Sequence, residues 1–564
     1  MSKARVEERL FALGVSLATA ILMLATEPRM AIGWDEGYTL GREERLRDWF
    51  RGLRDPVGFA KTWQPRSISE DLLQRDDGTP PPRRAQLDTR SKLLFDHDVL
   101  AWFWPFAREE PHGHPPFYAL LGLVGDVLAP SWPDLQRARL GPILLFSLTA
   151  GVIFLFVAAR WGNGAAALAA GAWVLQPNLF GHGHYAGYDA VLTSLWILSI
   201  IVFARVVAPA ASLPARSRWC WTLTFGLVLG CAAATKLTGW FLPLPFLAWA
   251  VLYRSRQGFT TLFLGLVIAV LVLWALLPPW WTQPLAGMVR FLESNLNRGK
   301  TIPIKVLFLG TVYNTPKESL PWYNTLVWTL IVTPVGFLML AGVGFWAALR
   351  NWRNESIGLL IAGHWVFLMI LRALPHTPGH DGVRLFLPAF GILALLAGLG
   401  ARSLLDHWGR WAKAAIATAL LEGLITTVVM MPVPLSYFSP LVGGLPGAAA
   451  LGMEPTYYWD ALSPGARAWL AENTLPGRTD AFSGFATSWL YLRRTGELPR
   501  RLYRIDAGDP QWLVIQNRPG AFSREDRALV AKGRPAYTGT KLGVPLIWIF
   551  PVNEVERVNA KHGR

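Results

Sequence analysis

The sequence predicts a polytopic α-helical membrane protein with about eleven transmembrane helices and a small α/β domain at its C-terminal end. Two observations predict the helical part. Of the 564 residues, 52% are hydrophobic and only 16% are charged, and the apolar residues gather in runs long enough to cross a bilayer. A third observation predicts the α/β part, because beyond Met431 the hydropathy falls and short strand-like runs take over.

The predicted spans begin with an apolar run that follows Lys3, Arg5 and Arg9. No convincing cleavage site follows this run, so we expect an uncleaved first span. The runs that we expect to cross the membrane are residues 10–24, 140–159, 165–180, 190–206, 219–235, 240–253, 259–277, 325–349, 357–371, 385–399 and 414–431. A further apolar stretch, residues 117–128, is expected to lie on the membrane surface.

The basic residues of the short loops predict the orientation. With the N-terminus inside, every short inner loop is basic; these loops carry Arg160, Arg205, Arg216, Arg218, Arg254, Arg256, Arg350, Arg353, Arg402, Arg410 and Lys413. The short outer turn 182–188 has no Lys or Arg. We therefore expect a multi-pass protein of the inner (plasma) membrane with a cytoplasmic N-terminus and an extracytoplasmic C-terminus.

Two domains are expected. Residues 1–431 form a transmembrane domain with a large first outer loop, 34–115, and residues 432–564 form an extracytoplasmic domain. In the second domain, residues 512–515 and 546–550 read as strands. Ser463 before Pro464, and Ser523 with Asp526 three residues later, read as helix starts.

The net charge of +16 does not indicate nucleic-acid binding, because the basic residues fall in small groups between apolar runs. The two cysteines, Cys220 and Cys231, share one apolar run and lie too far apart along a helix for a disulfide. A cysteine metal site and a disulfide framework are therefore excluded.

Ionisable residues gather on the predicted outer side. Asp35 and Glu36 follow the first span, where a carboxylate pair can serve acid–base chemistry or can simply keep the span end in water. The other outer-side candidates are His114, Asp189, Lys236, Tyr313, Tyr323 and Arg384. Such groups are costly near a membrane unless paired or used, although Lys236 and Arg384 can also snorkel at span ends.

The outer turn with His182, His184 and Asp189 has a second interpretation. Imidazole and carboxylate groups suit several divalent ions, so a metal site is one alternative. Turn-forming polar residues between two spans are the commoner explanation.

Short motifs in this order resemble the C-type membrane glycosyltransferases, and within them the protein O-mannosyltransferase family and its bacterial relatives, which include the 4-amino-arabinose transferase acting on lipid A. The matching pieces are Asp35-Glu36, His114-Pro115-Pro116, Asp189, Thr235-Lys236 with Gly239, and Val383-Arg384-Leu385-Phe386-Leu387-Pro388. Residues 308–313 and 321–323 look like the family's acceptor-side loop. The resemblance covers roughly the first 400 residues.

The resemblance implies an inverting transfer of a sugar from a polyprenyl-phosphate donor to an acceptor hydroxyl outside the cytoplasm. It implies that Asp35 is the general base, that Glu36 orients Asp35 or binds the sugar, and that Lys236 and Arg384 bind the donor phosphate. His114, Asp189, Tyr313 and Tyr323 would bind substrate. The O-mannosyltransferases imply no metal, so no cofactor is expected. The partners expected are the lipid-linked donor and the bilayer, and the sugar and the acceptor stay open.

Two alternatives come from other classes. One is a membrane transporter of a lipid-linked or anionic substrate, which often contains interrupted helices such as those expected at Pro243, Pro245, Pro278 and Pro279. Against this, charge gathers at one face and no internal repeat is visible. A structural or receptor role would place the working part in the C-terminal domain.

Overall fold

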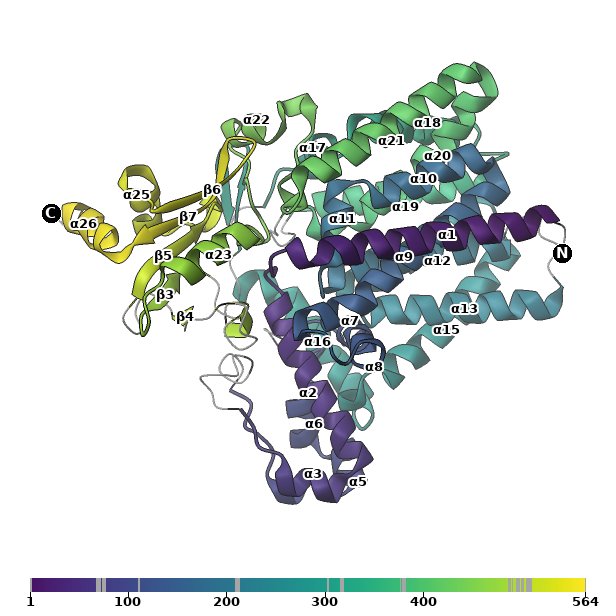
Figure 1. Cartoon of the computed structure of the whole chain (residues 1–564). Coiled ribbons are helices and arrows are strands. Elements are labelled where there is room, and N and C mark those ends of the chain that lie inside the picture. The colour runs from purple at the N-terminus through teal and green to yellow at the C-terminus, as the bar shows by residue number, and fades with distance from the viewer. Residues whose placement is uncertain are drawn as a thin grey trace.

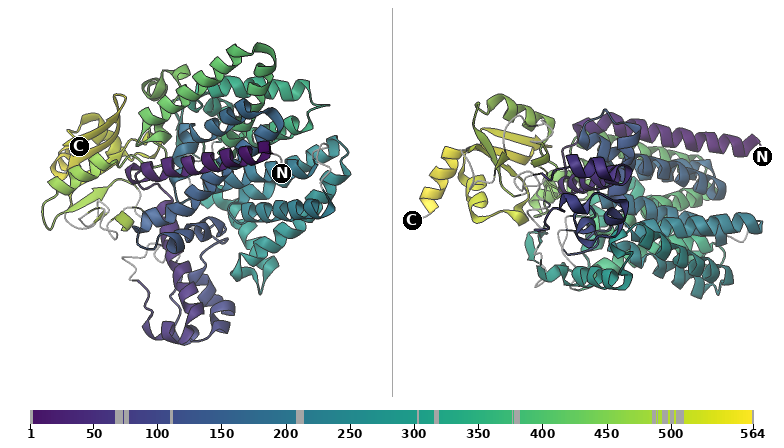
Figure 2. Two further views of the ribbon diagram at one scale, coloured as in Figure 1. Left: turned by 45° about the vertical axis from the view of Figure 1, so that its right-hand side comes forward. Right: turned by 90° about the horizontal axis from the view of Figure 1, so that it is seen from below.

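In the computed structural model, a bundle of long helices is joined at one end to a smaller module built on a β-sheet (Figure 1). The structure describes residues 3–66, 73, 78–109, 112–207, 214–301, 304–314, 319–375, 377, 382–484, 488, 490–492, 498, 502–503 and 510–562. The N-terminus lies at the far end of the bundle from the module, as a second view shows (Figure 2).

Seven helices in the described residues are long and apolar enough to cross a membrane. They are α1 (Lys3–Thr26, with the 3-10 turn that follows it), α9 (Asp134–Trp161), α12 (Tyr188–Val207), α15 (Arg256–Ala275), α19 (Ser356–Ala373), α20 (Pro388–Trp408) and α21 (Arg410–Met430). The bundle also contains α10 (Asn163–Val174), α11 (Pro177–His184), α13 (Ala215–Ala233) and α14 (Pro243–Leu252). A multi-pass helical protein is thus indicated, and the count of about eleven spans stays a prediction.

The run predicted as a single span over 325–349 is interrupted at Pro334. Its two parts are α17 (Asn324–Val332) and α18 (Val335–Arg350), because proline offers no N–H and clashes with the preceding turn. The freed N–H groups of Val335 and Gly336 donate to the Glu422 carboxylate at 2.7 and 2.6 Å. A partner for such groups is required in an apolar environment, and α21 supplies it.

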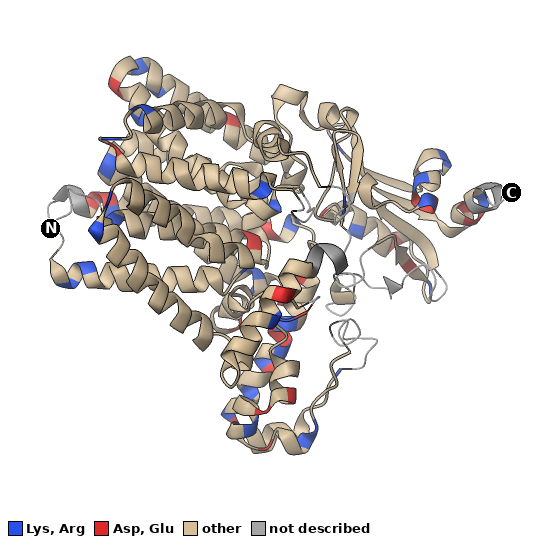
Figure 3. Ribbon diagram, turned by 180° about the vertical axis from the view of Figure 1, so that it is seen from behind, with Lys and Arg blue, Asp and Glu red and all other residues tan. Residues whose placement is uncertain are grey.

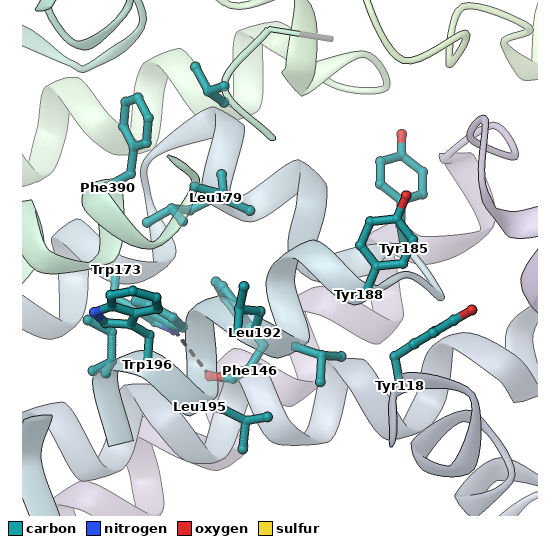
Figure 4. Packing of buried hydrophobic residues seen from close by; sticks show 14 of the residues in the cluster. Tyr118, Phe146, Trp173, Leu179, Tyr185, Tyr188, Leu192, Leu195, Trp196 and Phe390 are labelled. Atoms are coloured by element: carbon teal, nitrogen blue, oxygen red, sulfur yellow. Dashed lines mark hydrogen bonds between the residues drawn. The ribbon is translucent and has the colours of Figure 1, made fainter. Parts of the chain in front are cut away.

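Close helix contact in the bundle depends on small residues. A Cβ added to Gly344 on α18 would lie 1.9 Å from the carbonyl oxygen of Leu396, and one added to Gly400 on α20 would lie 1.9 Å from that of Leu340. The two backbones therefore touch reciprocally, which is typical of helix packing in membranes. Aromatic side chains fill the bundle core elsewhere, with Trp173 donating to the Phe146 carbonyl (3.1 Å; Figure 4).

The first outer loop folds into a helical arm that extends sideways from the bundle (Figure 1). Its helices are α2 (Glu36–Arg54), α3 (Pro56–Thr62), α5 (Arg90–Phe95) and α6 (His97–Phe103). Trp49, Phe59, Trp63 and Phe103 are buried between them. Next along the chain, α7 (Phe117–Gly122) and α8 (Val124–Leu128) pack on α9.

The large outer loop before α17 contains α16 (Pro284–Thr301) and a hairpin of β1 (Lys305–Phe308) with β2 (Thr311–Asn314). The two strands pair antiparallel, with Val306 opposite Tyr313.

The C-terminal module is a five-stranded mixed sheet in the order β4-β3-β5-β7-β6. Its elements are β3 (Thr479–Phe482), β4 (Leu502–Tyr503), β5 (Pro510–Gln516), β6 (Tyr537–Lys541), β7 (Val544–Pro551), α23 (Pro464–Asn473), α25 (Arg524–Lys532) and α26 (Val552–His562). The predicted strand runs lie in β5 and β7. The predicted helix starts are confirmed, since Ser463 accepts from the Ala466 N–H and Ser523 forms a capping box with Asp526.

Between bundle and module the chain forms α22 (Gly444–Ala450) and then a segment without helix or strand, residues 453–462, which we call the connecting strap. Thr456 donates its N–H to the Asn517 carbonyl (3.3 Å), and Ala461 donates its N–H to the Gln516 side chain (2.7 Å). The strap is thereby attached to the end of β5, while its other side contacts the bundle.

Candidate active site

Asp35 lies in the loop between α1 and α2, at the end of the bundle that faces the module. Its carboxylate does not cap α2 but points to residues from three other parts of the chain. Asp35 Oδ2 accepts hydrogen bonds from the hydroxyls of Tyr188 (2.8 Å) and Tyr458 (3.3 Å) and forms an ion pair with Arg384. Among the described residues, Asp35 Oδ1 has no hydrogen-bond donor, and the side chain is 13% exposed.

Asp189, at the start of α12, binds two cations. Lys236 Nζ lies 2.6 Å from Asp189 Oδ1, and Arg384 Nε lies 2.9 Å from Asp189 Oδ2. Arg384 therefore bridges Asp189 and Asp35. We call Asp35, Asp189, Lys236 and Arg384 the charge cluster. Its two acids and two cations balance, which is how charged groups tolerate burial.

Each member of the charge cluster comes from a chain turn at the same end of the bundle. Asp189 is in the first turn of α12, Lys236 sits between α13 and the 3-10 turn Leu237–Phe241, and Arg384 begins the 3-10 turn before α20. Mixed blue and red residues mark this region in Figure 3, whereas the middle of the long helices is largely tan. The sequence predicted these four residues for one face, and the structure brings them together.

Aromatic rings line the charge cluster. Arg384 lies over the Tyr458 ring at 4.5 Å, and Lys236 lies over the Tyr188 ring at 4.7 Å. Tyr118, Tyr185 and Tyr188 lie at one end of the aromatic core, away from the two tryptophans at its other end (Figure 4). Burial alone would lower the pKa of Arg384, but Asp35 and Asp189 hold that pKa well above the ordinary value of an arginine. Arg384 therefore stays charged.

The side chain of Glu36 points away from the charge cluster that Asp35 joins. Arg139 on α9 donates from Nε to Glu36 Oε1 (2.8 Å) and from Nη2 to Oε2 (2.7 Å). The N–H groups of Gly33 and Ala186 also donate to this carboxylate, each at 2.8 Å. Arg139 Nη1 binds Glu27 at 2.8 Å. Glu36 thus holds the Asp35 loop through a fully buried ion pair, and a direct catalytic part for it stays a prediction.

His114 is placed beside the charge cluster. Its ring centre lies 3.9 Å from that of Tyr188, the residue whose hydroxyl binds Asp35. His114 is buried, so it supports the position of Tyr188 from the side of the outer arm.

Tyr313 and Tyr323 are not brought into the charge cluster. Tyr313 lies on β2 and Tyr323 just before α17, and both contact the Phe308 ring at about the same centroid distance, 6.5 and 6.4 Å. Phe308 contacts Trp328, which in turn contacts Tyr457 of the connecting strap. Both tyrosines thus belong to an aromatic group beside the strap, and their substrate role stays a prediction.

The outer-turn histidines each have a protein partner. His182 Nε2 lies 3.1 Å from the Tyr457 hydroxyl, and His184 Nδ1 lies 2.7 Å from the Phe180 carbonyl oxygen. Asp189 is engaged by Lys236 and Arg384. Within the described ranges, no group of three or more His, Cys, Asp or Glu side chains is arranged to hold a metal ion.

Three residues of the site were not predicted as such: Tyr188, Tyr458 and Arg139. Arg139 lies just before the predicted span 140–159 and two residues after Arg137, so its position in the sequence resembles that of an ordinary basic residue at a span end. Tyr188 directly precedes Asp189 and shares its turn. Tyr458 is 423 residues from Asp35, so the pairing has no local signal in the sequence.

Asp460 in the connecting strap is expected to make the stability of the folded protein depend on pH. Its side chain is fully buried, and neither carboxylate oxygen accepts a hydrogen bond from another described residue. Burial raises the pKa of Asp460 from 3.8 to about 6. The folded protein therefore binds this proton more tightly than the unfolded chain, and stability from this group is lost as the pH rises from about 4 to 6.

We expect Asp460→Asn to stabilise the protein at about pH 8, by on the order of 2 kcal/mol, because the variant avoids a buried charge. The gain should shrink towards pH 4.5, where the wild-type carboxyl is protonated. Thermal midpoints in detergent at several pH values measure this. Asp480, which is also buried but accepts from the Thr474 hydroxyl at 2.9 Å, is the matched control: Asp480→Asn should bring no gain. Equal midpoints for wild type and Asp460→Asn at pH 8 would contradict the expectation.

Comparison with known proteins shows that one segment of the chain matches a protein family. Residues 114–281 match the family model described as dolichyl-phosphate-mannose-protein mannosyltransferase. This segment contains three predicted site residues, His114, Asp189 and Lys236. No curated protein sequence matches the chain.

The fold is similar to that of solved structures. ArnT from Cupriavidus metallidurans bound to undecaprenyl phosphate is 15% identical, with 96% of this chain and 97% of ArnT covered and a TM-score of 0.51. The apo state of the same ArnT is 16% identical, with 97% and 98% covered and a TM-score of 0.51. The archaeal oligosaccharyltransferase AglB from Archaeoglobus fulgidus is 13% identical, with 90% and 69% covered and a TM-score of 0.46.

The matched segment and the shared fold agree with the motifs from which the resemblance was predicted. The predicted resemblance is confirmed: residues 114–281 match the mannosyltransferase family model, and the fold of the whole chain is similar to that of ArnT.

Proposed function

We propose that this protein transfers a sugar, with inversion, from a polyprenyl-phosphate donor to an acceptor hydroxyl at the outer face of the membrane. The observation that carries the proposal is the charge cluster, in which Asp35 keeps one carboxylate oxygen open among the described residues, beside two cations. The relationship to glycosyltransferases supports it, and so does the undecaprenyl phosphate bound by ArnT.

Asp35 Oδ1 is the oxygen that takes the acceptor proton. Its partner oxygen Oδ2 is already engaged by Tyr188, Tyr458 and Arg384, so the carboxylate is held in one orientation. As the proton moves to Oδ1, the acceptor oxygen attacks the anomeric carbon of the donor. The bond from that carbon to the phosphate oxygen breaks on the opposite side. A single displacement of this kind inverts the anomeric configuration.

Lys236 and Arg384 stabilise the departing polyprenyl phosphate. Negative charge grows on the phosphate oxygen as its bond to the sugar breaks, and buried cations stabilise such charge more strongly than exposed ones. Asp189 holds both cations in place, at 2.6 and 2.9 Å. His114 supports Tyr188 on the acceptor side, and the proposed reaction uses no metal.

The inner membrane, with a cytoplasmic N-terminus and an extracytoplasmic C-terminus, is the location proposed. Basic residues at the end of the helices near the N-terminus support it (Figure 3), because cytoplasmic loops carry an excess of Lys and Arg. The charge cluster and the C-terminal module then lie outside, in the proposed domains 1–431 and 432–564.

The test uses the purified protein in nanodiscs, a panel of radiolabelled polyprenyl-phosphate sugars, and a membrane extract as the source of acceptors. Lys236→Met is expected to lower kcat/KM for the accepted donor about 100-fold, because one buried cation at the leaving group is lost. Lys236→Arg should retain more activity than Lys236→Met. The control is Lys92→Met, since Lys92 is exposed on α5 and pairs with Asp88.

Two outcomes would contradict the proposal. One is wild-type kcat/KM in Lys236→Met. The other is passage of the labelled lipid, with its sugar bond intact, across the membrane of sealed vesicles that contain the protein, which would favour transport.

A further inference from the structure

Tyr458 joins the charge cluster from outside the helical bundle. It belongs to the connecting strap, yet its hydroxyl lies 3.3 Å from Asp35 Oδ2 and its ring lies 4.5 Å from the Arg384 guanidinium carbon. One side chain thus contacts both the residue that takes the proton and a residue that binds the donor phosphate in the proposed function.

The structure holds this side chain from several sides. The Trp34 N–H donates to the Tyr458 carbonyl at 3.0 Å, so the strap backbone is bonded to the Asp35 loop itself. The rings of Tyr185 and His182 lie 5.2 and 5.4 Å from the Tyr458 ring. A Cβ at Gly33 would lie 2.5 Å from the Tyr458 ring, so only glycine leaves room for it there.

The Tyr458 hydroxyl keeps its proton. Burial raises the pKa of Tyr458 well above its ordinary value, and the nearby Asp35 carboxylate raises it further. Tyr458 is therefore a hydrogen-bond donor to Asp35 and not a competing base. The titratable and charged groups that surround it are Asp35, His182, Tyr185, Tyr188, Asp189 and Arg384.

We propose that Tyr458 is a positioning residue through which the C-terminal region completes the active site. Its hydroxyl keeps Asp35 Oδ2 occupied, so that Oδ1 faces the acceptor, and its ring keeps Arg384 between the two carboxylates. This inference rests on the proposed function and extends it, because it gives the C-terminal region a direct part in the reaction.

The hydrogen bond has a measurable consequence for the pH dependence. A donated hydroxyl stabilises the charged form of a carboxylate relative to the neutral form. Removing the hydroxyl should move the acid limb of the pH–rate profile to higher pH. A residue with a purely structural role would change the amount of folded protein without moving this limb.

The experiment measures the pH–rate profile of sugar transfer for the full-length wild type, Tyr458→Phe, Tyr457→Phe and Asp35→Asn in nanodiscs. For Tyr458→Phe we expect about a tenfold lower kcat, a donor KM within about twofold, and an acid limb about half a pH unit higher. Tyr457 is the matched control, since it is the adjacent buried tyrosine and its hydroxyl donates to Asn178 (2.7 Å) instead. Its variant should keep the wild-type limb.

The outcomes separate the two proposals. If Asp35→Asn abolishes transfer but Tyr458→Phe keeps the wild-type limb and kcat, the inference on Tyr458 is wrong and the proposed function stands. If Asp35→Asn transfers sugar as the wild type does, Asp35 is not the base, and the part of the proposed function on which the Tyr458 inference rests fails. If Tyr458→Phe does not fold, Gly33→Ala replaces it, because its Cβ displaces the Tyr458 ring and should raise the acid limb in the same way.

Discussion

Asp35→Asn is expected to lower the rate of sugar transfer about 1,000-fold, because an amide cannot take the acceptor proton. The change keeps the size of the side chain. Its remaining oxygen can still accept from Tyr188, Tyr458 and Arg384, so the fold should be retained. The measurement is single-turnover transfer from the accepted donor, with folded protein quantified by size-exclusion chromatography.

The control for Asp35→Asn is Asp88→Asn in the outer arm. Asp88 is about half exposed and pairs with the surface residue Lys92, so its variant should transfer sugar at the wild-type rate. Asp35→Glu should retain more activity than Asp35→Asn, because it keeps a base. Wild-type turnover in Asp35→Asn would rule out Asp35 as the base.

Arg139→Met is expected to give the largest loss of stability, about 3–5 kcal/mol. Arg139 is fully buried and donates to both Glu36 oxygens, to Glu27 and to the carbonyls of Met30 and Ala31. Its removal would leave two buried carboxylates without their cation. The Asp35 loop, which Glu36 holds, should loosen at the same time.

The detergent-solubilised protein is heated and then passed over a size-exclusion column. The measurement is the temperature at which half of the protein has been lost from the monodisperse peak. Arg137→Gln is the matched control, since Arg137 lies two residues away and pairs near the surface with Asp126 and Asp134. Its midpoint should change little. The triple variant Glu27→Gln, Glu36→Gln, Arg139→Met should recover part of the loss, because the two side chains that Arg139 contacts are then uncharged. A midpoint for Arg139→Met equal to that of the wild type would show that the ion pair does not hold this loop.

The sequence by itself determined the membrane character of the protein and four members of its candidate site. Charged groups stand out in an apolar chain because each is costly near a membrane unless paired or used. The positions of Asp35, Asp189, Lys236 and Arg384 relative to the apolar runs therefore indicated a common membrane face. Short motifs in a fixed order then indicated the family whose model matches residues 114–281.

The tertiary structure alone decided which of these residues face one another. Adjacent side chains at the start of a helix point in different directions, so Asp35 reaches the charge cluster while Glu36 reaches Arg139. Sequence spacing gives no sign that Asp35 and Tyr458, 423 residues apart, are in contact. Their contact arises because the connecting strap returns over the end of the bundle, where tertiary packing and not local pattern sets the position of each side chain.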